Sequence, residues 1–91
     1  MMFIEAVIRV RNELNKARIL FPEWPESRVE QSAIIIEEAG EVVKLALNLR
    51  PEDRHYPQSM TAWDDAMAEW QKELVQTAAM AIRALVDGAK P

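Results

Sequence analysis

Apolar residues recur at helical spacing in three stretches of this chain, and two proline-containing breaks separate those stretches. A chain with this pattern has few folds open to it besides a small helical bundle. The first stretch runs roughly from Met2 to Leu20, and the two prolines of the sequence FPEWPES end it. Its apolar stripe consists of Phe3, Val7, Val10, Leu14, Ala17 and Phe21.

The second stretch begins with a capping pattern, because Ser27 is followed three residues later by Glu30. It should run to about Leu49, where the next proline stops it. Residues 50–59 (RPEDRHYPQS) are polar, contain two prolines and show no periodicity. This segment is therefore predicted to be a loop.

The third stretch opens with Thr61 and Asp64 as a second capping signal and continues to Val86. Gly88 is the expected C-cap of this helix. A segment of about 26 residues is long for a globular protein, so it leaves room for a kink or break near Trp70.

The composition favours the same secondary structure, with two glycines, no cysteine and many Ala, Leu, Glu, Arg and Met residues. We expect an all-α fold in a single domain over residues 1–91, a helical bundle of three to four helices per chain. The second stretch is apolar around more than half of its circumference, and residues 74–86 are expected to be mostly buried. One chain offers too little surface to cover these faces, so homo-oligomerisation is expected to complete the bundle.

The charge and cysteine content exclude several classes of protein. Eleven Lys and Arg residues against fifteen Asp and Glu residues give a net charge of −4, which argues against a nonspecific nucleic-acid binder. The lack of cysteine and the single histidine, His55, exclude a disulfide framework and the usual zinc sites. The N-terminal apolar run contains Glu5 and Arg9, so neither a signal peptide nor a membrane span is expected, and the predicted location is the cytoplasm.

Three glutamates occupy unexpected places on the helical wheels. Glu38 falls inside the apolar arc of the second helix and Glu41 lies at its edge, three residues further on. Glu73 lies on an apolar surface of the third helix, and Gln76 follows three residues later. A carboxylate in such a setting must be protonated, paired with arginine or bound to a divalent cation. Oxygen ligands without histidine or cysteine select magnesium, or else manganese.

A plainer interpretation of each glutamate is a residue at the rim of the core or a salt-bridge partner. The recurrence of the same three-residue spacing on two apolar helices favours the metal site over this interpretation. Both remain open on the spacing alone.

The sequence EEAGE at residues 37–41, followed by VVKLALNL, and the later sequence KELVQTAA at residues 72–79 resemble the MazG-like all-α nucleoside triphosphate pyrophosphohydrolases. The resemblance covers about residues 22–87. It implies a bundle assembled from at least two chains, a homodimer or homotetramer. It also implies magnesium-dependent cleavage of a nucleoside triphosphate to the monophosphate and pyrophosphate.

The same resemblance implies roles for individual residues. Glu38 and Glu41 match the first metal-binding pair of that superfamily, and Glu73 matches the first member of the second pair. Glu37 matches a glutamate proposed to activate the attacking water. Gln76 stands where the family usually has aspartate, and the stretch between Glu41 and Glu73 is longer than usual. An amide oxygen can still ligate, but the lost charge should weaken magnesium binding.

Three further residues are candidates for binding the substrate. Trp24 could stack on a nucleobase or cap the small core. Lys44 could reach a phosphate or pair with Glu37 or Glu41. Arg83, on the polar strip of the third helix, has the same two alternatives. The expected function is a magnesium-dependent nucleotide pyrophosphohydrolase, and the alternative is a non-catalytic nucleotide-binding or protein-interaction module on the same scaffold.

Overall fold

Three α-helices and no strand make up residues 1–88, the part of the chain that the computed structural model describes. The helices are α1 (Phe3–Leu20), α2 (Arg28–Leu47) and α3 (Met60–Asp87). The all-α expectation is confirmed, with three helices in this part of the chain. Residues 89–91 of the predicted domain lie outside the described residues.

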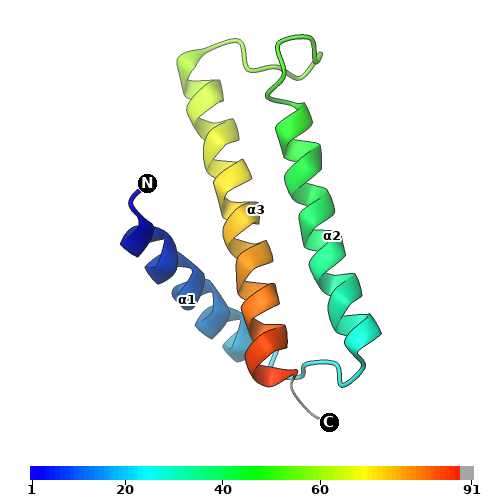
Figure 1. Ribbon diagram of the computed structural model, residues 1–91. Helices are drawn as coiled ribbons and strands as arrows, with labels where there is room; N and C mark the ends of the chain where they lie inside the picture. The colour runs from blue at the N-terminus through cyan, green and yellow to red at the C-terminus, as the bar shows by residue number, and fades with distance from the viewer. Residues whose placement is uncertain (89–91) are drawn as a thin grey trace.

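The helix α3 lies between the other two (Figure 1). It packs against α1 on one side and α2 on the other, and within residues 1–88 α1 and α2 do not contact each other. The molecule is therefore elongated, with extents of 49 × 27 × 22 Å. Its radius of gyration of 15.1 Å exceeds the roughly 12 Å expected for a compact chain of this length.

The helix starts follow local capping chemistry. The Ser27 hydroxyl accepts a hydrogen bond from the Glu30 amide at 3.3 Å, so the predicted cap of α2 is confirmed. The predicted cap of α3 is wrong by two residues, because the Ser59 hydroxyl accepts from the Ala62 amide at 3.0 Å. The sequence offered two hydroxyl residues near this start, and only the tertiary structure shows which one caps the helix.

The helix α3 runs unbroken for 28 residues, so no break occurs near Trp70. Its interior contains neither proline nor glycine, and it packs against both other helices. Gly88 follows as the C-cap, as predicted, although its φ of −92° is not left-handed. A side chain at Gly88 would collide with the side chain of Gln31 and the carbonyl of Ala84, so close approach explains the glycine.

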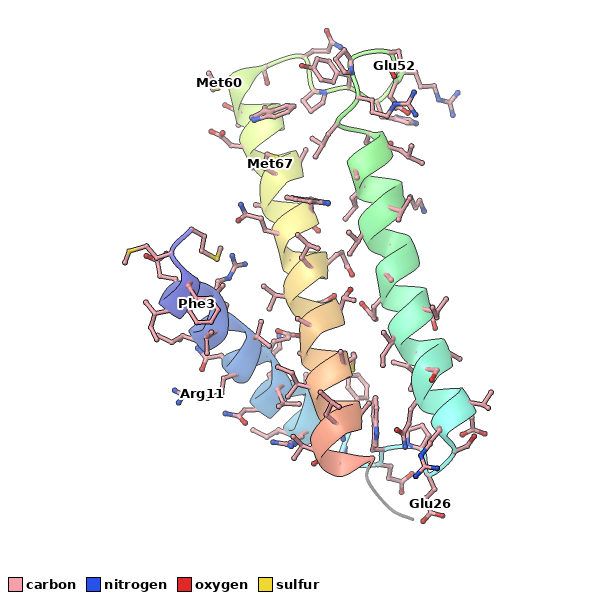
Figure 2. All side chains as sticks on the ribbon, in the orientation of Figure 1. Phe3, Arg11, Glu26, Glu52, Met60 and Met67 are labelled. Atoms are coloured by element: carbon pink, nitrogen blue, oxygen red, sulfur yellow. The ribbon has the colours of Figure 1, made fainter. Side chains whose placement is uncertain are left out.

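The core of the described chain is small. Leu14, Ala17 and Ala79 are its only buried apolar residues, and no large side chain is fully buried. The stripe predicted on α1 packs only in part, since Phe3 remains 84% exposed near the outer end of that helix (Figure 2). The expectation that residues 74–86 are mostly buried is also wrong for the single chain, because Leu85 and Val86 are exposed.

No helix within residues 1–88 is long and apolar enough to cross a membrane.

Candidate functional site

The centre of the candidate site is a contact between carboxyl groups on two neighbouring helices. Glu38 projects from α2 toward α3, where its carboxyl group lies close to the Glu73 side chain. Burial raises the pKa of Glu38, and the neighbouring carboxyl group of Glu73 raises it further. Smaller contributions come from the charges of Glu37 and Glu41. The neutral form of Glu38 is therefore favoured beside Glu73.

Gln76 completes this group from the next turn of α3. The amide is oriented so that its nitrogen faces Glu73. In this orientation the nitrogen donates to the two carboxylate oxygens of Glu73 at 3.1 and 3.2 Å. In that orientation the amide oxygen of Gln76 points away from Glu73 and is available to another partner. A neutral amide here avoids the repulsion that a third carboxylate would bring to the protein without a cation.

The predicted ligand set is thus brought together in part. Glu38, Glu73 and Gln76 meet between α2 and α3, whereas Glu41 is exposed and affects Glu38 only through its charge. Among residues 1–88, no three His, Cys, Asp or Glu side chains converge as a metal-binding group. What the geometry does assemble is two carboxyl groups and one amide.

A pocket of about 430 Å³ adjoins this group. Glu38 and Gln76 contribute to its lining together with Trp24 and Arg83, so four predicted site residues from three segments meet around one cavity. Sequence reasoning missed the rest of the lining, because no local pattern brings these residues together. Those residues are Glu13, Ala17, Phe21, Glu23, Pro25, Ile34 and Met80.

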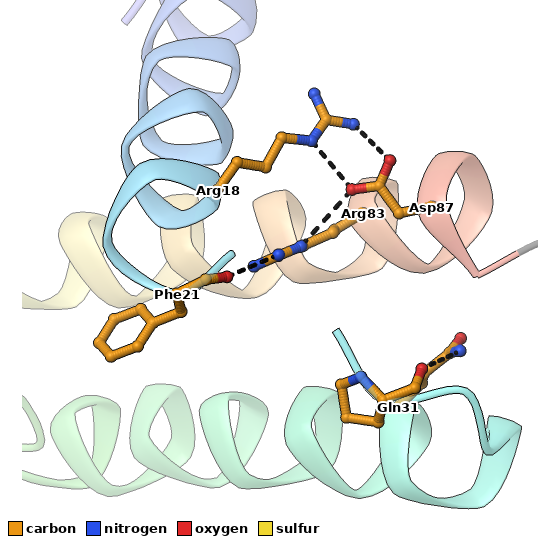
Figure 3. Close-up of polar contacts among 6 residues, drawn as sticks. Arg18, Phe21, Gln31, Arg83 and Asp87 are labelled. Atoms are coloured by element: carbon orange, nitrogen blue, oxygen red, sulfur yellow. Dashed lines mark hydrogen bonds and ion pairs between the residues drawn. The ribbon is translucent and has the colours of Figure 1, made fainter. Parts of the chain in front are cut away.

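Arg83 has a structural role in the pocket wall. Its side chain is only 3% exposed, so its predicted place on a polar strip does not make it a solvent-facing residue. The guanidinium donates to the Phe21 carbonyl at 2.7 Å (Figure 3). It also lies 4.8 Å from the centre of the Trp24 ring. Arg83 therefore fixes the connector between α1 and α2 against α3.

Asp87 links Arg83 to the end of α1. Its carboxylate accepts two hydrogen bonds from Arg18 at 2.8 and 2.9 Å and lies 3.5 Å from Arg83 Nε (Figure 3). The hydrogen bonds from Arg18 hold the pKa of Asp87 below its ordinary value. The four-residue spacing of Arg83 and Asp87 could have suggested their pairing, but Arg18 is 69 positions from Asp87 in the sequence.

Arg83 covers one face of the Trp24 ring. The indole nitrogen of Trp24, Nε1, is buried and has no hydrogen-bond partner among the described residues. A buried indole N–H normally finds an acceptor, so a ligand acceptor in the adjoining pocket would satisfy it.

Lys44 and Glu37 do not belong to the pocket lining. Both are exposed on α2, away from the contact between Glu38 and Glu73. Within one chain the structure therefore does not bring these two candidates to the cavity.

No family model matches the chain, and no curated protein or solved structure matches it either.

Proposed function

We propose that this protein is a magnesium-dependent nucleotide pyrophosphohydrolase of the MazG-like type. It would cleave a nucleoside triphosphate to the monophosphate and pyrophosphate, acting in the cytoplasm as a homodimer or homotetramer. The observation that carries the proposal is the pairing of Glu38 with Glu73 beside a pocket that also contains Trp24. A carboxyl pair next to an aromatic cavity suits a cation and a nucleobase better than a purely structural role.

The residues present fit magnesium by their donor chemistry. This ion prefers hard oxygen ligands and is commonly held by one or two carboxylates together with substrate phosphates and water. Glu38 and Glu73 provide two carboxylates, and the amide oxygen of Gln76 provides a third donor. A cation beside Glu38 would offset the burial and the negative neighbours that raise the pKa of this carboxyl group. Manganese, which accepts the same ligands, is the alternative.

When bound, the cation would neutralise triphosphate oxygens and polarise the α-phosphorus. Glu38 and Glu73 would hold it, and the amide of Gln76 would orient Glu73. Trp24 forms one wall of the pocket for the base, with Arg83 fixing the ring in place.

Glu37 is proposed as the residue that accepts a proton from the attacking water, an assignment that rests on the family resemblance. Water adds to the α-phosphorus as the bond to the bridging oxygen breaks, and pyrophosphate leaves. Lys44 lies one turn from Glu41 and remains a candidate for contacting phosphate.

The alternative is a non-catalytic nucleotide-binding or protein-interaction module on the same scaffold. One observation favours it: Gln76 donates to Glu73 at the position where the family usually has an aspartate ligand. Such a protein would bind triphosphate without turnover.

The test is pyrophosphate release from a panel of standard and modified nucleoside triphosphates, with magnesium or manganese present. We expect product from at least one triphosphate, and a loss of about 100-fold or more in Glu38→Gln and Glu73→Gln. Glu69→Gln is the matched control, because Glu69 is exposed on α3 one turn before Glu73. Gln76→Asp should tighten cation binding.

Two outcomes separate the candidates. No product from any triphosphate, with the protein folded, contradicts the catalytic proposal. Triphosphate binding without product would instead support the non-catalytic module.

A further inference from the structure

The helix α2 carries apolar residues on two opposite faces. The face toward α3 contains buried and half-buried residues, including Glu38. The opposite face contains a second row at alternating spacings of four and three residues, the repeat found in helices that pair along their length. We call this row the outer α2 seam, and it consists of Val29, Ala33, Ile36, Gly40, Val43 and Leu47.

Every residue of the outer α2 seam is exposed in the single chain. Val29 is 78% exposed, Ile36 71% and Val43 59%, which is unusual for a regular apolar row on one helix. No other helix within residues 1–88 covers this side of α2, because α1 lies across α3 from it (Figure 2).

Gly40 lies in the middle of the outer α2 seam and has no explanation within one chain. Apart from proline, glycine is the least favourable residue inside a helix. Gly40 has no left-handed backbone, and a Cβ placed there would meet nothing within 4 Å. The missing side chain is useful only if the backbone of another helix approaches at this point.

The accessible surface area of the single chain is larger than that of a compact monomer. Its accessible surface is 6770 Å², against roughly 5,400 Å² expected for a compact monomer of 10.4 kDa. The excess is larger than the roughly 800 Å² that each partner buries in a standard protein interface. A chain with so small a core gains from covering its apolar face.

The charges beside the outer α2 seam identify the occupant as a second copy running antiparallel. Glu37 and Lys44 lie on the same flank of the seam, seven residues apart, and within residues 1–88 neither has an ion pair. Antiparallel pairing of two copies sets Glu37 of each against Lys44 of the other. Parallel pairing would set this flank of the two copies on opposite sides of the interface, so Glu37 and Lys44 would form no such ion pair.

The same geometry accounts for Gly40. The midpoint between residues 37 and 44 lies beside Gly40, so the two-fold axis passes where the helix lacks a side chain. On either side of the axis, Ala33 of one copy then lies opposite Leu47 of the other, a small residue against a large one. The axis implied by the charges, between residues 40 and 41, and the axis implied by the Ala33–Leu47 pair, at Gly40, therefore lie within one residue of each other.

We propose that the outer α2 seam is a homodimer interface in which two α2 helices pack antiparallel about an axis at Gly40. The proposal specifies the face, the orientation and the register of the association. It does not depend on the proposed enzymatic function, because none of the seam residues lines the pocket. The ion pair also gives Lys44 a role that it lacks within one chain.

The absence of cysteine from the chain permits a direct test by crosslinking. Ala33→Cys and Leu47→Cys are prepared as separate variants and treated with a short bismaleimide, alone and as a mixture. We expect covalent dimers mainly in the mixture, because residue 33 faces residue 47 of the other copy. Asn15→Cys, on the exposed polar side of α1, is the control and should not be trapped with either variant.

A charge exchange provides the second measurement. Lys44→Glu should raise the dimer dissociation constant by about tenfold or more, as measured by sedimentation. The double variant Glu37→Lys, Lys44→Glu should restore association, and circular dichroism verifies that each variant is folded. Because the readout is mass, loss of the proposed catalytic function through Glu37 does not affect the result.

Three results would overturn the proposal. The first is a monomeric wild-type mass at micromolar concentration. The second is efficient crosslinking of each single-cysteine variant with itself but not in the mixture, which indicates parallel packing. The third is a dimer that neither cysteine traps and that Lys44→Glu leaves intact, which indicates another face or a different occupant.

Discussion

Replacing Arg83 with methionine is expected to destabilise the folded chain by about 2–4 kcal/mol. The variant keeps the length of the side chain but removes the hydrogen bond to the Phe21 carbonyl and the cation–π contact with Trp24. For a domain of this size the loss corresponds to roughly 10–25 °C in melting temperature. Since the core contains no fully buried large side chain, little other packing is available to compensate.

The measurement is thermal unfolding followed by circular dichroism at equal protein concentrations. Arg11→Met is the matched control, because Arg11 is exposed on α1 and lacks the buried contacts of Arg83. Arg83→Lys should fall between the two, since an ammonium group retains the charge but not the planar stacking surface. Equal melting temperatures for Arg83→Met and Arg11→Met would show that the buried guanidinium does not fix the connector.

The second large effect concerns Glu38 and magnesium. Without a cation, Glu38→Gln is expected to be more stable than the wild type at neutral pH, because the amide removes the cost of a half-buried carboxylate beside Glu73. Magnesium at about 100 times its dissociation constant should stabilise the wild type by about 2.7 kcal/mol. The same addition should leave Glu38→Gln almost unchanged.

The pH dependence has a definite sign. Folding raises the pKa of Glu38 above its ordinary value of 4.5, so the folded state holds the proton more tightly than the unfolded state does. The stability contributed by protonated Glu38 is fully present below that ordinary value and is lost as the pH rises through the raised value. The advantage of Glu38→Gln over the wild type should therefore be small at acidic pH and grow toward neutral pH.

Melting temperatures at acidic and neutral pH, with and without magnesium at constant ionic strength, provide the measurement. Glu69→Gln serves again as the exposed control on α3. A wild type that does not respond to magnesium, together with unchanged stability in Glu38→Gln, would favour a rim glutamate over a cation site.

The helices were predictable because their signals are local. Proline positions, the hydroxyl of Ser27 and the apolar period are all readable over a few residues, and the observed bounds of α2 differ from the expected ones by two residues at most. Local signals also placed Glu38 in an apolar arc, and the structure puts it against Glu73. The helical wheels of the second and third helices each place a glutamate, Glu38 and Glu73, on an apolar surface, and this suggested that the two meet.

What the sequence could not show is which faces are covered. A helical wheel places Arg83 on a polar strip, but the connector between α1 and α2 folds over that strip and buries the guanidinium, which donates to the Phe21 carbonyl. The same limit applies to the pocket, whose lining comes from segments far apart in the chain. Burial of a polar group depends on partners that only the tertiary fold supplies.

The two connections between helices differ in how they are held, and this difference bears on how the chain tolerates insertions. Residues 21–27 have no regular structure, yet side chains from both long helices hold their carbonyls: Arg83 binds Phe21 and Gln31 binds Pro25, each at 2.7 Å. The hydrogen bonds of residues 48–59 are mostly local, such as that from the His55 amide to Asp53. A fused peptide or a new pair of termini should therefore be accommodated in the second connection and be disruptive in the first.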